Sequence, residues 1–418
     1  MSNWIKVKLG DIVELKRESY QPKPDEVLPY IGLEHIGQGT LRLISVGKSN
    51  EVTSTKSYFS KGDILFGKLR PYFRKVVRPK FNGVCSTDIL VLTSKNPRKF
   101  NQTFLFYLMA SQEMIDLATA SSSGTKMPRA DWKVLQNLEI SIPEDVNEQE
   151  RIGKILETID DKIDINIRMN KTLEEMAMTL YKHWFVDFGP FQDGEFVDSE
   201  LGMIPEGWKV IRLEEIITLK HGYAFKSKQF SDEENEKVVV RMGNFKEGPG
   251  LQFLDNTKFL IDDSVDEKYK LKPNDLVIVL SDVTREGRII GRAGFIPEDH
   301  REYWLNQRVA KIETEKMYKY LLYCLFNSDL FRHHCITSAN STTVLNLKNE
   351  HLYNYKIALP DDKVIFEFNK KMETIIRLIL ENEQQNISLM HTRDYLLPRL
   401  LSGEIDVSQA EKQVEEVL

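Results

Sequence analysis

The opening of this chain occurs twice. Residues 3–15, NWIKVKLGDIVEL, return in altered form at residues 207–219 as GWKVIRLEEIITL. Self-similarity at a fixed spacing indicates a duplicated structural unit. The chain of 418 residues is therefore expected to fold as two copies of one unit. At an offset of 204, four positions coincide: Trp4 with Trp208, Leu9 with Leu213, Ile12 with Ile216, and Leu15 with Leu219.

The repeat continues beyond this opening. The segment KGDILF at 61–66 resembles PNDLVIV at 273–279, where a turn with an aspartate precedes an apolar strand. Later matches fall at offsets of 216 and 217, so the second copy contains additional loop residues. These later matches are Tyr107 with Tyr323 and Pro143 with Pro360.

Each copy combines short β-rich runs with turns and helical stretches. This mixture predicts a mixed α/β domain of about 145–160 residues per copy. The matched aspartates Asp63 and Asp275 each precede such a run, and we interpret them as turn residues. The runs are Ile64–Phe66 and Ile89–Thr93 in the first copy, and Leu276–Leu280 and Arg308–Ile312 in the second.

After each copy the sequence becomes helical. In residues 147–186 and 363–401 apolar residues recur at spacings of three and four, which forms a narrow stripe typical of a coiled coil. Forty residues of helix would extend about 60 Å. Because one apolar stripe needs a partner and the two segments have similar lengths, we expect them to pack against each other.

Two asparagines interrupt each stripe at matched places. A buried asparagine in a coiled coil costs stability but fixes the register of the helices, and a possible partner for Asn170 is Asn386. The alternative is that these side chains lie on the solvated flank. The four residues are Asn166, Asn170, Asn382 and Asn386.

Charge is unevenly distributed along the chain. The formal net charge of −6 divides into +8 for residues 1–143, −9 for 144–200, zero for 201–360 and −5 for 361–418. A basic surface on the first copy can therefore face a polyanion while the acidic segments face away from it.

Basic and small polar residues in the first copy suggest contacts with nucleic acid. The segment KLRPYFRKVVRPK at 68–80 has six basic residues among thirteen. Lysine and arginine neutralise phosphates, and arginine can also bind guanine in the major groove. The alternative is a solvated loop surface. The candidates are Lys68, Arg70, Arg74, Thr87, Thr125, Lys126 and Arg129.

The second copy has polar loops at matched places with different side chains. Asn306-Gln307-Arg308 corresponds to Ser86-Thr87-Asp88, before equivalent strands. Asparagine and glutamine can bind adenine through two hydrogen bonds, but they can equally cap strand ends. Two domains with one fold and different loops would read two different half-sites. The candidates are Arg285, Arg288, Arg292, Asn306, Gln307, Thr342, Thr343 and Asn346.

No motif for catalysis, metal binding or membrane insertion is evident in the sequence. There is no phosphate-binding glycine-rich loop of the kind found in nucleotide-binding enzymes, and the adjacent His333, His334 and Cys335 would point to different faces of a helix. Three scattered cysteines and the absence of a signal segment favour the cytoplasm. We therefore expect no catalytic residue, no metal and no cofactor in this chain.

Junction motifs give the chain a resemblance to a known family. HWFVDFGPF at 183–191, leading to LGMIPEGW at 201–208, resembles the junction between the central helix and the second recognition domain in specificity subunits of type I restriction–modification systems. LLPRLLSGEI at 396–405 resembles the end of the distal helix in that family.

The resemblance implies a fold, a set of partners and a mechanism. The fold would be mixed α/β, with two target-recognition domains separated by an antiparallel two-helix coiled coil of pseudo-twofold symmetry. Two methyltransferase subunits would use S-adenosylmethionine to methylate adenine in double-stranded DNA. Restriction subunits would use ATP and Mg²⁺. The implied segments are a first recognition domain at 1–145, a central helix at 146–190, a linker and second recognition domain at 191–360, a distal helix at 361–405 and a charged tail at 406–418.

Two other interpretations remain open from the residues alone. The chain could be a stand-alone regulator that binds DNA, or a DNA-modifying enzyme whose motif is not recognisable. Turnover by the purified chain without partners would favour the enzyme.

Overall fold

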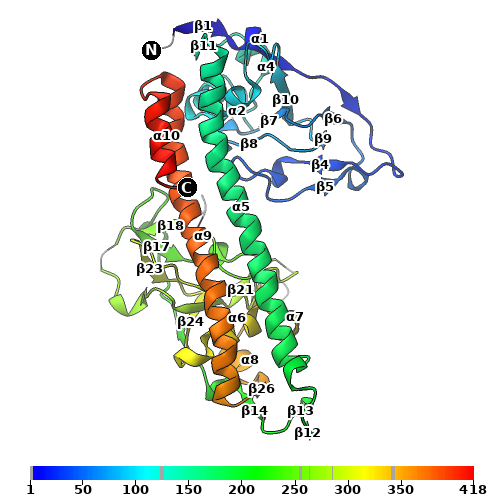
Figure 1. Cartoon of the computed structure of the whole chain (residues 1–418), viewed down its shortest axis with the longest axis vertical. Helices are drawn as coiled ribbons and strands as arrows, with labels where there is room; N and C mark the ends of the chain where they lie inside the picture. The colour runs from blue at the N-terminus through cyan, green and yellow to red at the C-terminus, as the bar shows by residue number, and fades with distance from the viewer. Residues whose placement is uncertain (1–2, 123–126, 254–256, 263, 285, 340–343) are drawn as a thin grey trace. The chain divides into compact units, whose positions relative to one another are not determined.

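The structure is a computed structural model that describes residues 3–122, 127–253, 257–262, 264–284, 286–339 and 344–418. Its contacts form two units. Unit 1 contains Met1–Ile165 and Gln385–Leu418, and unit 2 contains Asn166–Gln384. Figure 1 shows two long helices, α5 (Val146–Phe185) and α9 (Asp362–Ser402). Each helix contributes residues to both units. Their bounds agree with the helices predicted at 147–186 and 363–401.

The described residues of unit 1 form three sheets and several helices. A four-stranded sheet has the order β2-β10-β7-β8, a five-stranded sheet has the order β3-β6-β9-β4-β5, and β1 pairs with β11. The strands are β1 (Trp4–Lys8), β2 (Val13–Leu15), β3 (Ser19–Tyr20), β4 (Pro29–Ile31), β5 (Gly47–Lys48), β6 (Lys56–Phe59), β7 (Ile64–Gly67), β8 (Val76–Val77), β9 (Gly83–Cys85), β10 (Ile89–Ser94) and β11 (Glu139–Pro143). The helices are α1 (Leu9–Ile12), α2 (Gln102–Ala110), α3 (Gln112–Ala120) and α4 (Trp132–Leu135), with short 3-10 turns η1 (Leu33–His35), η2 (Ser49–Glu51) and η3 (Pro71–Phe73).

Strand β7 explains how the sheets and helices of unit 1 form layers. Its residues are all buried, as in a strand covered on both faces. Successive side chains of a strand point to opposite faces. Ile64 and Phe66 accordingly join the core with α2, α3 and the long helices, whereas Leu65 joins a separate core with Ile31 and Phe59 of the five-stranded sheet. The four-stranded sheet is therefore the middle layer of unit 1.

Unit 2 repeats this arrangement. Its four-stranded sheet has the order β15-β24-β20-β22, its five-stranded sheet has the order β16-β18-β17-β23-β19, and β14 pairs with β26. Its other pairs are β12 with β13 and β21 with β25. The strands are β12 (Phe196–Ser199), β13 (Gly202–Pro205), β14 (Lys209–Arg212), β15 (Thr218–His221), β16 (Phe230–Ser231), β17 (Lys237–Val240), β18 (Lys258–Leu260), β19 (Lys270–Leu271), β20 (Leu276–Val279), β21 (Ser281–Asp282), β22 (Ala293–Phe295), β23 (Glu302–Leu305), β24 (Val309–Glu313), β25 (Leu345–Asn346) and β26 (Lys356–Leu359). The α-helices are α6 (Lys319–Asn327), α7 (Asp329–Ser338) and α8 (Asn349–Tyr353), and the 3-10 turns are η4 (Gly189–Phe191), η5 (Leu213–Glu215), η6 (Ser227–Gln229), η7 (Met242–Asn244), η8 (Glu267–Tyr269) and η9 (Lys316–Tyr318).

The two units share one backbone frame, as the repeat predicts. The amide of Leu9 donates to the carbonyl of Leu138, and the amide of Leu213 donates to that of Tyr355, at the offsets of 204 and 217 found in the sequence. In each five-stranded sheet one pair is parallel, β4 with β9 and β17 with β23. The matched aspartates are turn residues. Asp63 accepts from the Ser60 amide at 2.7 Å and Asp275 from the Lys272 amide at 2.8 Å.

The long helices run antiparallel within each unit. In unit 2, Phe368 of α9 packs against Phe185 near the end of α5, and Asn382, further along α9, meets Asn170, further back on α5. In unit 1, Arg393 of α9 pairs with Asp160 of α5. Apolar residues spaced along both helices line the cores, including Ile152, Ile159 and Ile163 in unit 1 and Ala177, Tyr181 and Met372 in unit 2.

The segment expected to be a charged tail contains a helix. Helix α10 (Val407–Glu415) buries one face, through Val407, Ala410 and Val414, in the core of unit 1. It follows Gly403, which has φ +72° and whose missing Cβ would lie 3.0 Å from the ring of Trp4. Glycine suits this position because the left-handed conformation disfavours other residues and the tryptophan occupies the space.

Candidate DNA-recognition surfaces

Much of the basic segment 68–80 contacts the acidic face of the long helices within unit 1. Arg78 forms an ion pair with Glu157 of α5, and the Nζ of Lys80 lies 2.7 Å from the carboxylate of Asp161. Lys75 donates to the Leu33 carbonyl at 2.6 Å, and burial lowers its pKa. These cations form ion pairs or hydrogen bonds within the protein. The net charge of this segment therefore overstates the positive surface that is available to DNA.

The side chain of Arg74, which was predicted to contact DNA, is bound within the protein. Its Nε donates to the carbonyl of Ala110 at 2.7 Å, and its Nη2 lies 3.7 Å from the carboxylate of Asp394 on α9. Arg74 has φ +47°, an uncommon conformation for a residue other than glycine. The side chain therefore connects the recognition domain to α9 instead of pointing to an external anion.

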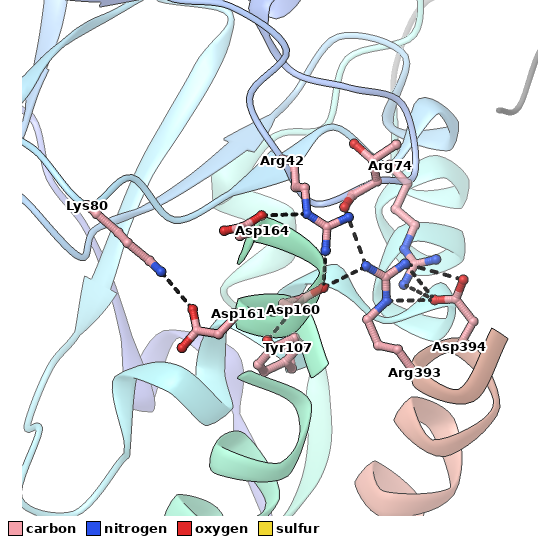
Figure 2. Close-up of polar contacts among 10 residues, drawn as sticks. Arg42, Arg74, Lys80, Tyr107, Asp160, Asp161, Asp164, Arg393 and Asp394 are labelled. Carbon is pink, nitrogen blue, oxygen red and sulfur yellow. Dashed lines mark hydrogen bonds and ion pairs between the residues drawn. The ribbon is translucent and has the colours of Figure 1, made fainter. Parts of the chain in front are cut away.

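Asp160 is the centre of a polar network that gives the carboxylates in this part of α5 a structural role (Figure 2). The carboxylate of Asp160 accepts from Arg42 at 2.8 Å, from Arg393 at 2.9 Å and from the Tyr107 hydroxyl at 2.8 Å. Arg42 also donates to Asp164 at 2.8 Å. Burial disfavours the charge of Arg393, but Asp160 and Asp394 outweigh burial and raise its pKa. The segment with net charge −9 thus contributes carboxylates that bind cations of the recognition domain.

Unit 2 uses different residues for the same purpose. The Nζ of Lys246 lies 3.3 Å from Glu174 of α5 and 2.6 Å from Glu383 of α9. Burial opposes the charge of Lys246, but the two carboxylates outweigh it and raise its pKa. Burial also raises the pKa of Glu174. In each domain a cation that follows the first strand of the parallel pair connects the domain to the long helices. This cation is Arg42 after β4 in the first domain and Lys246 after β17 in the second.

Lys68 and Arg70 remain candidates for phosphate contacts. Both are half-buried, and their amides are held by the carbonyls of Asp88 and Pro128. Arg70 has φ +50°, and its guanidinium lies 6.0 Å from the centre of the Phe73 ring. Thr87 is exposed. Thr125 and Lys126 lie outside the described residues.

Arg129 is exposed and is paired with Asp88. Its Nε lies 3.4 Å from the Asp88 carboxylate, and 47% of its side chain is accessible to solvent. Its backbone bridges to Leu69, which joins the end of β7 to the start of the segment that leads into α4. The backbone of Arg129 is therefore held by Leu69, and its side chain is oriented by Asp88.

Two predicted contacts in the second domain are buried and need correction. Arg292 is 6% exposed and donates from Nη1 to the carbonyl of Asn327 at 2.6 Å. Burial lowers its pKa, and the charge of Arg332 lowers it further. Asn306 is 9% exposed, and its Oδ1 accepts from the amide of Arg308, so it caps the turn before β24. The capping alternative is thus the one that the structure supports for Asn306.

Other candidates of the second domain differ in accessibility. Gln307 is exposed, and Arg288 is exposed with its Nη1 3.3 Å from Glu247. Asn346 is half-buried, and its Oδ1 accepts from Ser281 at 2.7 Å and from Arg308 at 2.8 Å. The residues Arg285, Thr342 and Thr343 lie outside the described residues.

Arg308 was not among the candidates, although its tripeptide was noted. It is exposed, and its Nη1 donates to Asn346 and, at 3.3 Å, to Ser281. The signal was a basic residue at the position of Asp88 in the other copy. The sequence alone does not single it out, because Asn306 and Gln307 of the same tripeptide also have side chains that can bind bases.

The helix asparagines are buried on α5, which favours the register interpretation over the solvated flank there. Asn166 is 1% exposed and Asn170 5% exposed, whereas Asn382 and Asn386 are half-buried. The Nδ2 of Asn382 donates to the Oδ1 of Asn170 at 2.8 Å, and Asn170 donates to the Ile379 carbonyl at 3.0 Å. The expected partner of Asn170, Asn386, was therefore wrong by one helical turn. In an antiparallel pair, residue numbers rise on one helix as they fall on the other, so equivalent positions cross.

The described residues contain no group of three or more His, Cys, Asp or Glu side chains suited to a metal ion. Among the same residues, no helix is long and apolar enough to cross a bilayer. All three cysteines are buried thiols, and burial raises the pKa of Cys85 to about 12.

Comparison with known proteins identifies the family. A family model described as the type I restriction modification DNA specificity domain matches residues 1–175 and 205–389. The chain belongs to this family. The two matched ranges cover the two copies of the repeat, each with the adjoining part of a long helix. Specificity subunits of type I systems are non-catalytic, and this chain accordingly is a subunit that recognises DNA.

Individual relatives agree with this assignment. The type I restriction enzyme MjaIX specificity subunit of Methanocaldococcus jannaschii is 27% identical over 336 residues, which cover 76% of each chain. The MjaVIII specificity subunit of the same organism is 26% identical over 417 residues, covering 97% of this chain and 93% of the relative. The fold resembles that of a type I restriction-modification S subunit from M. genitalium, with a TM-score of 0.55, 16% identity and 96% of both chains covered.

Proposed function

We propose that this chain selects a bipartite DNA target for a type I restriction–modification complex, with one half-site read by each recognition domain. The observation that carries the proposal is the combination of one backbone frame with different polar side chains at equivalent places. A shared frame presents side chains in the same way in both domains, and different side chains select different bases.

The partners follow from this assignment. Two methyltransferase subunits would bind S-adenosylmethionine and methylate adenine, and restriction subunits would use ATP and Mg²⁺ to cleave unmodified DNA. The complex would work in the cytoplasm. The chain itself would supply recognition of double-stranded DNA and a surface for assembly.

Co-expression with candidate methyltransferase subunits, followed by mapping of methylated adenines, tests this proposal. We expect methylation at one sequence made of two short half-sites with unread base pairs between them. Replacing residues 1–143 with the first domain of another family member should change one half-site and preserve the other. Methylation in which both half-sites change would contradict a modular target.

The same purified components distinguish the alternatives. The chain alone, incubated with DNA, Mg²⁺ and S-adenosylmethionine, should neither methylate nor cleave. Turnover by the chain alone would favour an enzyme. Specific DNA binding by the chain, together with failure to associate with any methyltransferase subunit, would favour a stand-alone regulator.

A further inference from the structure

One polar contact recurs at the same place in both recognition domains. In the first domain it joins Asp88 and Arg129, and in the second it joins Arg308 and Asn346. The arginine comes from opposite members of the pair in the two domains. The position of the contact is the same in both domains, but the residue types differ. Two domains that recognise different sequences require such a difference.

Backbone hydrogen bonds establish that these positions are equivalent. The Lys68 amide donates to the Asp88 carbonyl at 2.9 Å, and the Leu280 amide donates to the Arg308 carbonyl at 2.9 Å. The next link is also repeated: the Ala130 amide donates to Lys68 at 2.9 Å, and the Leu347 amide donates to Leu280 at 2.8 Å. Asp88 therefore corresponds to Arg308, and Arg129 to Asn346.

The turn before each of these strands is also the same. The amide of Asp88 is held by the Ser86 hydroxyl at 3.2 Å, and the amide of Arg308 is held by the Asn306 side chain at 3.3 Å. The side chains of Asp88 and Arg308 thus start from matching, fixed backbone positions.

The contacts described above orient both arginines but occupy only some of their N–H donors. The described partners of Arg308 lie on Nη1, and the described partner of Arg129 lies on Nε. A guanidinium has five N–H donors in a rigid fork. Among the described residues, two nitrogens of each guanidinium have no partner and remain for a ligand, Nε and Nη2 of Arg308 and the two Nη atoms of Arg129. Two parallel donors match the O6 and N7 acceptors of guanine.

The remaining side chains favour a base over a phosphate as the ligand. A phosphate beside Arg129 would be repelled by Asp88, whereas a carboxylate can accept from the N4 amine of cytosine. In the second domain the buried Ser281 hydroxyl and the Asn346 amide hold Arg308, and Asn346 also donates to the Val344 carbonyl at 3.1 Å. Holding a long side chain in place before binding reduces the entropy lost on contact.

We propose that Arg129 and Arg308 are the guanine-reading residues of the first and second domains, and that Asp88 and Asn346 position them. This inference depends on the proposed function and extends it to the chemistry of the target. Each half-site should contain a G·C pair that is read at this contact. Arg308 contacts the base in this scheme, whereas Asn346 acts through Arg308.

Methylation mapping with the assembled methyltransferase complex tests the inference, with Arg308→Ala, Arg308→Lys and Arg129→Ala compared with the unaltered chain. We expect Arg308→Ala to reduce preference at one G·C pair of one half-site by roughly tenfold to a hundredfold, with the other half-site unchanged. Arg129→Ala should do the same in the other half-site. Arg308→Lys should also lose the preference, because lysine retains the charge but lacks the fork.

Three further variants complete the test, two at the positioning residue and one as a control. Asn346→Ala should weaken the same preference that depends on Arg308, and Asn346→Asp should restore much of it because an acceptor oxygen is kept. Arg212→Ala removes an exposed arginine of unit 2 that pairs with Glu214, and its methylated sequence should be unchanged.

Three results would overturn the inference. These are half-sites without any G·C pair, unaltered preferences in both arginine-to-alanine variants, and full retention of preference in Arg308→Lys, which would indicate a phosphate contact. A different result, in which the unaltered complex methylates no defined sequence, would reject the proposed function itself.

Discussion

Neighbouring aspartates of α5 provide a test of which ion pairs stabilise unit 1. Asp160 binds Arg393, whose side chain is only 2% exposed, and it also binds Arg42 and Tyr107. Asp161 binds Lys80, with side chains 44% and 66% exposed. We predict that Asp160→Asn strongly destabilises unit 1 and that Asp161→Asn hardly affects it.

The magnitudes follow from burial. Removing one partner of a buried ion pair costs about 3–5 kcal/mol, because the other charge stays buried without compensation. Asp160 is itself 17% exposed and Arg393 retains Asp394, so we expect the lower value, about 3 kcal/mol. An exposed pair contributes about 0–1 kcal/mol. With a urea dependence of about 2 kcal/mol per molar, the midpoints should fall by about 1.5 M for Asp160→Asn and by about 0.25 M for Asp161→Asn.

Thiol labelling can measure the two units separately. A chain with two units need not unfold in one step, so a global signal would be ambiguous. Cys85 is the one cysteine of unit 1, whereas Cys324 and Cys335 lie in unit 2. Pulse alkylation in urea, followed by mass spectrometry of the labelled peptides, gives a midpoint for each unit.

The urea midpoints of the two variants test whether burial sets the contribution of each ion pair to stability. Asp160→Asn should shift the Cys85 midpoint and leave the onset of Cys324 labelling nearly unchanged. Equal, small shifts for Asp160→Asn and Asp161→Asn would refute the view that the buried network, and not the number of ion pairs, stabilises this part of the protein.

Three other outcomes are expected. The double variant Lys68→Ala, Arg70→Ala should reduce the slope of DNA affinity against salt concentration, for the assembled complex, by about two phosphate contacts. Arg78→Ala should leave this slope unchanged. Fluorescence anisotropy across a salt series measures both slopes, and a slope altered by Arg78→Ala would contradict the assignment of Arg78 to Glu157. Replacing Asn170 and its partner Asn382 by leucine should raise the urea midpoint of Cys324 labelling, because apolar residues replace a buried polar pair; a lower midpoint would show that the pair contributes net stability. In the native protein the buried thiols, for which burial raises the pKa, should alkylate slowly at pH 8, and fast labelling without urea would contradict their burial. These thiols belong to Cys85, Cys324 and Cys335.

The sequence alone determined the duplication, the two long helices and four strands of the two domains, β7, β10, β20 and β24. These features are local or periodic: an apolar residue at every third or fourth position predicts a helix face, and a short apolar run after a turn, such as 64–66, favours a strand. The junction motifs, which are also contiguous, sufficed to indicate the family. Even the turn role of Asp63 and Asp275 could be inferred, because a turn is decided by neighbouring residues.

Only the tertiary structure decided which charged residues are available for DNA. The sequence cannot tell a cation that faces solvent from one that is paired inside the protein, because the partner lies far along the chain: Arg78 meets Glu157, and Arg42 meets Asp164. The same holds for burial of Arg292, for the crossing of equivalent asparagines in an antiparallel pair, and for the contact that orients Arg308. Each depends on which segments pack together, and packing is a property of the whole fold that no local pattern contains.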